Sequence, residues 1–234
     1  MTGELRYLYA VANASADTAI AAAGLRGIDG GRVEAVVEGR LLGATSAVSA
    51  ADYEEEPLNE RRQDLNWLAP RAASHQDVNG KLLDLASAVI PVAFGAIYRG
   101  TEGVRELLRT RADDLADRLR AVEGRAEWIV SIEREGSGAP LGDATRDAAV
   151  AEETWATIEA IAERVYREPL IGDPTAAAIA RFSVLASRER EIELGEVVRR
   201  LAATGTSEGY RVRLSGPWPT YRFGGLPTEP VASA

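Results

Sequence analysis

Residues 89–98 of the sequence read VIPVAFGAIY, and this stretch predicts a strand that is buried on both faces. A nearly continuous apolar run of this length is typical of a strand in a sheet that is covered on both sides. Pro91 stands near the start of the run, where the loss of one backbone donor is tolerated. The run is followed by a predicted amphipathic helix, with Thr101 as its N-cap and Gly124 at its C-terminal end. A strand and a helix in succession indicate a fold that mixes the two.

Three more strands and one helix are predicted ahead of this run. Apolar residues alternate with other residues at 5–11 and 33–37, and an extended pattern resumes at 41–48. Glutamates between the valines of the second strand indicate a sheet with one buried and one solvent-exposed face. A helix is predicted to end near Ala86, with Pro70 at a point where that helix must start, kink or break. The N-terminal order is therefore β-β-β-α-β-α.

After Gly124 the pattern predicts a second domain. Strands are predicted at residues 128–132, 178–186 and 210–214, and helices at residues 143–167 and 190–203. The resulting order, β-α-β-α-β, is close to the split βαβ or ferredoxin-like arrangement. We therefore expect an α+β fold in two domains. Residues 1–124 form the N-terminal domain, residues 125–215 form the ferredoxin-like C-terminal domain, and residues 216–234 form an extended tail that packs back on a domain and has a flexible end.

The composition excludes several classes of function. Among 234 residues there are 27 Lys or Arg and 36 Asp or Glu, which gives a formal net charge of −9. Nucleic acid is not expected as a partner, because binding to the phosphate backbone needs a surplus of cations. The absence of cysteine and the single histidine, His75, exclude disulfides, thiolate metal sites and histidine-rich metal sites. No signal peptide and no membrane span are evident, and we expect a soluble cytoplasmic protein.

Three patterns that resemble catalytic or ligand sites are better explained by structure. The glycine-rich residues 24–31 have the composition of a phosphate cradle, but no helix N-terminus follows them, which favours turns. Adjacent carboxylates such as Asp113 and Asp114 point about 100° apart on a helix and do not converge. His75 continues the apolar stripe of a helix and is interpreted as a packed, hydrogen-bonded residue. No catalytic residue, cofactor or metal site is predicted.

Aromatic residues gather in the C-terminal tail, where Trp218, Tyr221 and Phe223 stand among glycines and prolines. The two prolines around Trp218 hold the chain extended and remove backbone donors. Two interpretations remain open. In the first, the aromatic side chains cover the core of a domain. In the second, they form a preformed surface that binds a protein partner, because aromatic anchors dominate many interfaces.

Several segments match one known family in the same order along nearly the whole chain. The most specific are WLAPR at residues 67–71 and GPWPTYRF at residues 216–223. The others are YLYA at 7–10, LRGIDG at 25–30, the run at 89–98, the helix that follows it and GRAEW at 124–128. Together these segments resemble the gas vesicle protein F/L (GvpF/GvpL) family. Family members commonly have Pro and Ser where this chain has Thr220 and Arg222.

The resemblance implies a non-enzymatic accessory or minor structural protein of gas vesicles, located in the cytoplasm and on the vesicle. Its implied partners are the hydrophobic shell protein and other accessory proteins, which it binds during vesicle nucleation and assembly. A shell subunit with a very apolar face aggregates unless a soluble partner covers that face. Trp218, Tyr221 and Phe223 are the candidate partner-binding residues.

Two alternatives remain. The first is a small-ligand-binding or enzymatic protein that uses a cleft between the two domains near Arg125. The second is a structural shell component that does not act as a chaperone.

Overall fold

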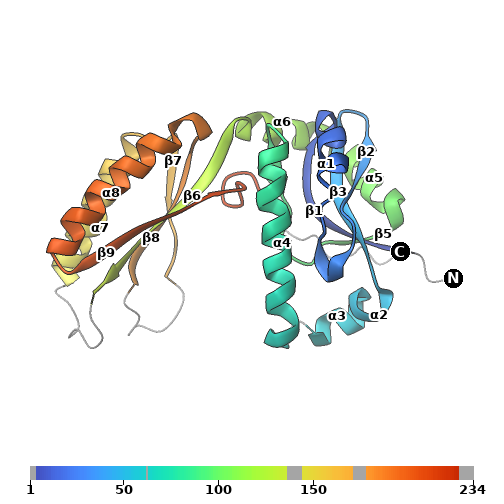
Figure 1. Ribbon diagram of the computed structural model, residues 1–234, viewed down its shortest axis with the longest axis horizontal. Helices are drawn as coiled ribbons and strands as arrows, with labels where there is room; N and C mark the ends of the chain where they lie inside the picture. Colours follow the sequence, from blue (N-terminus) through green and yellow to red (C-terminus); the bar gives the residue numbers. More distant parts are fainter. Residues whose placement is uncertain (1–3, 62, 136–143, 171–177, 227–234) are drawn as a thin grey trace. The chain divides into compact units, whose positions relative to one another are not determined.

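The computed structural model describes residues 4–61, 63–135, 144–170 and 178–226. The chain divides into two compact units. The first unit comprises Met1–Glu123 and Pro219–Ala234, and the second unit comprises Gly124–Trp218. Each unit combines an antiparallel sheet with helices, so the predicted α+β class is confirmed (Figure 1).

The sheet of the first unit is built around its first strand. Its described strands are β1 (Leu5–Asn13), β2 (Glu34–Glu38), β3 (Leu41–Val48), β4 (Val89–Pro91) and β5 (Ile97–Arg99). The order is β2-β3-β1-β4, and β5 pairs with β1 on the same edge as β4. All of these pairs are antiparallel. Because β1 has neighbours on both edges and side chains packed on both faces, it is buried along most of its length.

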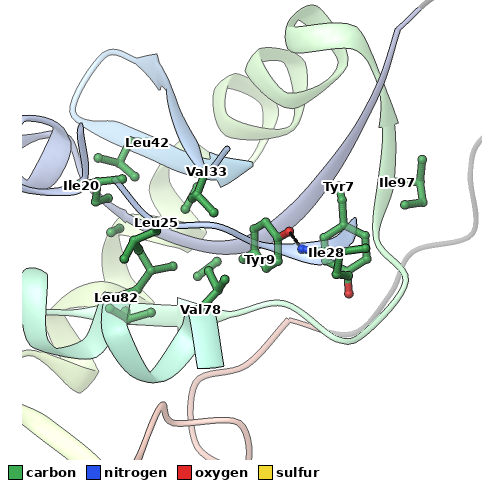
Figure 2. Packing of buried hydrophobic residues seen from close by; sticks show 14 of the residues in the cluster. Tyr7, Tyr9, Ile20, Leu25, Ile28, Val33, Leu42, Val78, Leu82 and Ile97 are labelled. Carbon is green, nitrogen blue, oxygen red and sulfur yellow. Dashed lines mark hydrogen bonds between the residues drawn. The ribbon is translucent and has the colours of Figure 1, made fainter. Parts of the chain in front are cut away.

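Helices cover both faces of this sheet. The described helices of the first unit are α1 (Asp17–Ala23), α2 (Ala50–Tyr53), α3 (Glu55–Arg61), α4 (Leu65–Leu85), α5 (Gly100–Thr110) and α6 (Ala112–Val122). On one face, Tyr7 and Tyr9 of β1 pack among apolar side chains from α1 and α4, including Ile20, Val78 and Leu82 (Figure 2). The opposite face of β1 packs on α5 and α6 through Leu8, Val11, Val104, Leu108, Leu115 and Leu119.

The prediction of one strand over residues 89–98 was wrong. The run forms β4 and β5, and Gly95 between them has a φ of +91°. Backbone pairing with β1 holds at both ends of the interruption, because Val92 N donates to Tyr9 O at 2.9 Å and Leu8 N donates to Ala96 O at 2.9 Å. The apolar composition of the run indicates burial correctly, but it does not reveal the local excursion around Gly95.

Three predictions about helices also need correction. The single helix predicted after Thr101 is two helices, α5 and α6, separated at Arg111, and α5 begins at Gly100 without a side-chain cap. Helix α4 continues through Pro70 without a break. Its N-terminus is held by Asp64, whose carboxylate accepts hydrogen bonds from the backbone N–H groups of Asn66 and Trp67. Helix α1 was not predicted.

The second unit has the ferredoxin-like order β-α-β-β-α-β. Its elements are β6 (Arg125–Arg134), α7 (Ala144–Glu159), β7 (Arg164–Arg167), β8 (Ala178–Ser187), α8 (Glu191–Ser207) and β9 (Tyr210–Trp218). The strand order is β7-β8-β6-β9. The predicted helix over 143–167 was too long, because the chain leaves α7 at Glu159 and adds β7 to the sheet edge. Pairing with β8 decides the conformation of these residues, since Val165 lies opposite Val184.

The sheet of the second unit has two different faces. Helices α7 and α8 cover one face, on which the ring of Trp155 lies 5.6 Å from that of Phe182 (Figure 1). Because side chains alternate along a strand, Arg181 and Ser183 point away from these helices. No described helix of the second unit covers this other side, which we call the open face.

Candidate partner-binding site

The tail residues 219–226 are part of the first unit. Leu226 N donates to Pro91 O at 2.9 Å, and Ala93 N donates to Leu226 O at 3.0 Å, so the tail forms a parallel bridge beside the end of β4. The side chain of Leu226 is only 4% exposed and packs into the core beneath α5 and α6. The tail therefore completes a sheet edge and a core of the first unit.

A tight turn carries the chain from Pro219 to this bridge. Tyr221 N donates to Pro219 O and Gly224 N donates to Thr220 O, both at 2.8 Å. A Cβ at Gly224 would lie 2.9 Å from Val122 Cγ1, so this close approach to α6 requires a glycine.

Tyr221 joins a hydrogen-bonded cluster on α4. Its hydroxyl lies 3.1 Å from His75 Nε2, accepts a hydrogen bond from Asn79 Nδ2 at 2.8 Å and donates to Gln76 Oε1 at 2.8 Å. On the other side of the ring, His75 Nδ1 lies 2.9 Å from the hydroxyl of Tyr7. Asn79 Nδ2 also lies 3.0 Å from His75 Nε2. With the amide as donor to Nε2, the ring hydrogen is on Nδ1 and is donated to Tyr7. We call these five residues the His75 cluster.

Aromatic rings enclose the His75 cluster. The ring of His75 lies 5.7 Å from that of Tyr7, 5.9 Å from Tyr9 and 5.8 Å from Phe94. Burial in this environment lowers the pKa of His75 to about 4 and raises the pKa of the Tyr7 hydroxyl well above its usual value. The cluster is therefore uncharged at neutral pH. His75 holds the tail in place and is not poised to exchange protons, as its packed interpretation predicted.

The glycine-rich residues 24–31 form turns whose amides are used internally. Gly27 N donates to Gly31 O, Gly31 N donates to Ile28 O, and Ile28 N donates to the hydroxyl of Tyr9 at 2.8 Å (Figure 2). A Cβ at Gly27 would lie 2.0 Å from the same hydroxyl. These residues therefore pack closely against β1. This packing favours the interpretation as turns over the interpretation as a phosphate cradle.

The predicted aromatic residues are divided between the units. Tyr221 and Phe223 belong to the first unit and are partly buried. Trp218 is the last residue of β9 in the second unit, where it pairs with Glu127 and is 36% exposed. Its indole Nε1 donates to Ser215 Oγ at 3.3 Å. Because Ser215 points away from α7 and α8, Trp218 lies on the open face. The three aromatic residues therefore have different surroundings, and only Tyr221 and Phe223 lie with the tail on the first unit.

Metal and acid–base sites are not evident in the described part of the chain. No group of three or more His, Asp or Glu side chains there could hold a metal ion. Asp147 of α7 accepts hydrogen bonds from Arg134 and Tyr210, and the Arg134 hydrogen bond holds the pKa of Asp147 below its usual range. This carboxylate forms an ion pair with Arg134 of β6, which connects α7 to the sheet.

Residues 5–138 and 143–224 match the model of one protein family, described as gas vesicle synthesis protein GvpL/GvpF. The chain belongs to this family. It is 29% identical over 266 aligned positions to gas vesicle protein L of Streptomyces sp. (strain CB03234), covering 98% of this chain and 96% of the relative. The resemblance seen in the sequence is therefore confirmed.

Two crystal structures of GvpF share the fold. The protein from Anabaena sp. PCC7120 superposes with a TM-score of 0.74 over 94% of this chain and 96% of that chain, at 16% identity. The protein from Microcystis aeruginosa gives a TM-score of 0.73 over 97% of this chain and 100% of that chain, also at 16% identity. None of the described helices is long and apolar enough to cross a membrane.

Sequence reasoning missed several residues of the site. It did not connect Tyr221 with His75 and Asn79, because no spacing in a single sequence reports a contact over such a separation. It also missed Leu226, which falls in the part of the tail predicted to be weakly ordered. Arg181, Arg211 and Arg213 of the open face had a readable signal, since they alternate with apolar residues in the predicted strands.

Proposed function

We propose that this member of the GvpF/GvpL family is a non-enzymatic accessory protein of gas vesicle assembly. In this role it binds the hydrophobic shell protein and other accessory proteins during nucleation and limits aggregation of the shell protein. It acts in the cytoplasm and on the growing vesicle. Membership of the family is the observation that carries this proposal.

The surface of the second unit supports a role in protein contacts. Among its described residues, the large apolar side chains of Tyr166, Leu170, Ile192 and Trp218 are well exposed. Exposed apolar side chains on an acidic, charged protein fit a partner that covers an apolar surface and keeps it in solution. Trp218 is the strongest single candidate, because tryptophan is enriched among the residues that dominate binding energy.

The division of the aromatic residues gives each a different proposed role. Trp218 contacts the partner directly from the open face. Tyr221 and Phe223 act indirectly, because they hold the tail against the first unit. In this proposal, the partner-binding interpretation holds for Trp218, and the core-covering interpretation holds for Tyr221 and Phe223.

A retention assay tests the proposal. The full chain is immobilised and challenged with the shell protein of the same vesicle at low and moderate salt, and light scattering follows aggregation of the unbound shell protein. We expect retention and reduced scattering with the unchanged chain. Trp218→Ala should weaken retention without lowering the thermal midpoint, whereas Tyr221→Phe should lower the midpoint and leave retention nearly unchanged. Failure of the unchanged chain to retain the shell protein at either salt concentration would contradict the proposal.

The two alternatives have their own tests. A ligand-binding or enzymatic role requires convergent polar groups with poised pKa values, and Asp147 and His75 in the described chain are instead committed to structural contacts. A structural shell component without chaperone activity predicts normal nucleation and altered vesicle shape when the gene is deleted. Loss of nucleation in that deletion would favour the accessory role.

A further inference from the structure

We propose that the open face of the second unit binds an acidic segment of a protein partner through Arg181 and Arg213. This inference goes beyond the proposed function, because it does not depend on which protein supplies the segment. It follows from the register of three strands, from the lack of ion pairs at these two arginines among the described residues, and from the side chains that surround them.

The register of three strands places the two arginines on either side of a serine. Ser131 of β6 lies opposite Arg181 of β8 and, on its other edge, opposite Arg213 of β9. Directly opposed residues in antiparallel strands share one face, and neighbouring strands lie about 4.8 Å apart. The two arginine Cα atoms are therefore about 10 Å apart. At this spacing the two long side chains can reach one carboxylate above Ser131, whose hydroxyl can also donate to it.

Both guanidinium groups are available for such a ligand. Arg181 and Arg213 are exposed, and neither side chain forms an ion pair or hydrogen bond with another residue in the described part of the chain. Their neighbours differ in this respect. Arg211, also on the open face, pairs with Glu135 at 3.0 Å, and Arg125 pairs with Glu163 at 2.6 Å. Among the described residues, the row at Ser131 therefore has two guanidinium groups that form no ion pair.

The open face carries several arginines although the unit is acidic. In the sequence of the second unit, acidic residues outnumber arginines. The strand residues that point to the open face include Arg125, Arg164, Arg181, Arg211 and Arg213, and the acidic residues Glu127 and Glu133. Three carboxylates next to the strands also reach this face, because Glu135 pairs with Arg211, Glu163 pairs with Arg125 and Glu168 accepts a hydrogen bond from Ser183 Oγ. Two neighbouring guanidinium groups without an ion-pair partner attract a negatively charged segment and orient it on contact.

The composition of the face favours a protein carboxylate over other anions. Guanidinium groups bind carboxylates and phosphates in bidentate geometry. Trp218 and Tyr166 lie on the same face and are 36% and 41% exposed, so two aromatic anchors lie beside the arginine row, toward the N-terminal end of β6. Arginine with tryptophan and tyrosine is the composition of protein–protein hot spots. Glu127 and Glu133, within an acidic unit, oppose an extended polyanion such as nucleic acid.

The test measures the binding of a defined acidic probe to the full chain. The probe is a fluorescein-labelled peptide with six glutamates that alternate with glycines, and anisotropy reports binding at 50 and 300 mM NaCl. The variant R181E/R213E replaces both guanidinium groups of the row with carboxylates. The matched control is R199E/R200E, which makes the same charge change on α8, where both arginines are exposed. Circular dichroism and the thermal midpoint show that each variant is folded, and R181Q/R213Q replaces the first variant if it does not fold.

We expect salt-sensitive binding by the unchanged chain, an affinity loss of about tenfold or more in R181E/R213E, and a loss of less than about threefold in the control. Equal losses in the two variants would mean general electrostatic attraction and would overturn the site. No binding by the unchanged chain at 50 mM NaCl would also overturn it. Inorganic phosphate and a single-stranded oligonucleotide serve as competitors. Displacement of the peptide by either at a lower concentration than by unlabelled peptide would contradict the assignment to a protein carboxylate.

Discussion

The hydroxyl of Tyr221 lies 3.1 Å from Nε2 of His75, although 146 positions separate the two residues in the chain. This contact ties the tail to α4, and the bridge at Leu226 ties it to β4. The first unit is therefore incomplete until the chain has passed through the whole second unit and returned. Changes in the tail should therefore act on the stability of the first unit.

Replacing Tyr221 by Phe should lower the free energy of unfolding by about 1–2 kcal/mol. The ring is kept, but the hydrogen bonds to Asn79 and Gln76 and the polar contact with His75 are lost in a partly buried site. Equilibrium urea unfolding of the full chain measures the effect. Ile192→Ala, at a side chain that is 78% exposed, serves as the surface control and should change stability by less than about 0.5 kcal/mol. Equal effects of the two variants would show that the Tyr221 contacts contribute nothing.

Leu226→Ala should lower the free energy of unfolding by roughly 2–5 kcal/mol, because it leaves a cavity at a buried position in a well-packed core. The measurement is again urea unfolding, with hydrogen exchange at Ala93 as a local readout, since its N–H donates to Leu226 O. We expect faster exchange there in the variant. Unchanged stability and unchanged exchange would mean that the tail does not dock at β4 in solution.

Stability should fall as the pH drops from about 6.5 to about 4, in part because of His75. Burial lowers its pKa in the folded chain to about 4, whereas the unfolded chain has an ordinary histidine pKa of about 6.5. Between these values the unfolded state binds the additional proton, so stability increases with pH in this window and is independent of this group above it. The full difference between the two pKa values corresponds to about 3 kcal/mol in the free energy of unfolding.

The variant His75→Gln isolates this contribution. Unfolding free energies of the unchanged chain and the variant are compared at pH 7.5, 6, 5 and 4.5. The difference between the two proteins should shrink as the pH falls, because only the unchanged chain loses the histidine contribution. A constant difference over this range would show that His75 is not held neutral by burial.

Two glycine substitutions should have opposite effects. Gly80 lies inside α4, and no atom lies within 4 Å of the position that a Cβ would take there, so Gly80→Ala should stabilise by about 0.5–1 kcal/mol through helix propensity. Gly27→Ala should destabilise by about 2 kcal/mol or more, because its Cβ would lie 2.0 Å from the buried hydroxyl of Tyr9. Thermal unfolding of both variants checks the signs. A stabilised Gly27→Ala would contradict the packing of this turn against β1.

Much of the fold could be predicted from the sequence because its signals are local. The alternation in β1 and the amphipathic pattern of α5 and α6 follow from which side chains must be buried. The errors occurred where pairing with a distant strand overrode a local pattern. Residues 164–167 fit a helical period, yet they form β7 because β8 offers backbone partners and an apolar neighbour for Val165. The break at Gly95 likewise depends on pairing with β1 at both ends.

The sequence by itself determined the α+β class, the family and the absence of cysteine-based and histidine-rich metal chemistry, because composition, periodicity and motifs are properties of the chain alone. Only the tertiary structure decided where the three aromatic residues of the tail lie. Tyr221 and Phe223 belong to the first unit, whereas Trp218 ends a strand on the open face of the second. It also aligned Arg181, Ser131 and Arg213 across three strands. The first outcome depends on the return of the chain from the second unit to the first, and the second depends on strand register. Both are set by contacts between residues far apart in sequence.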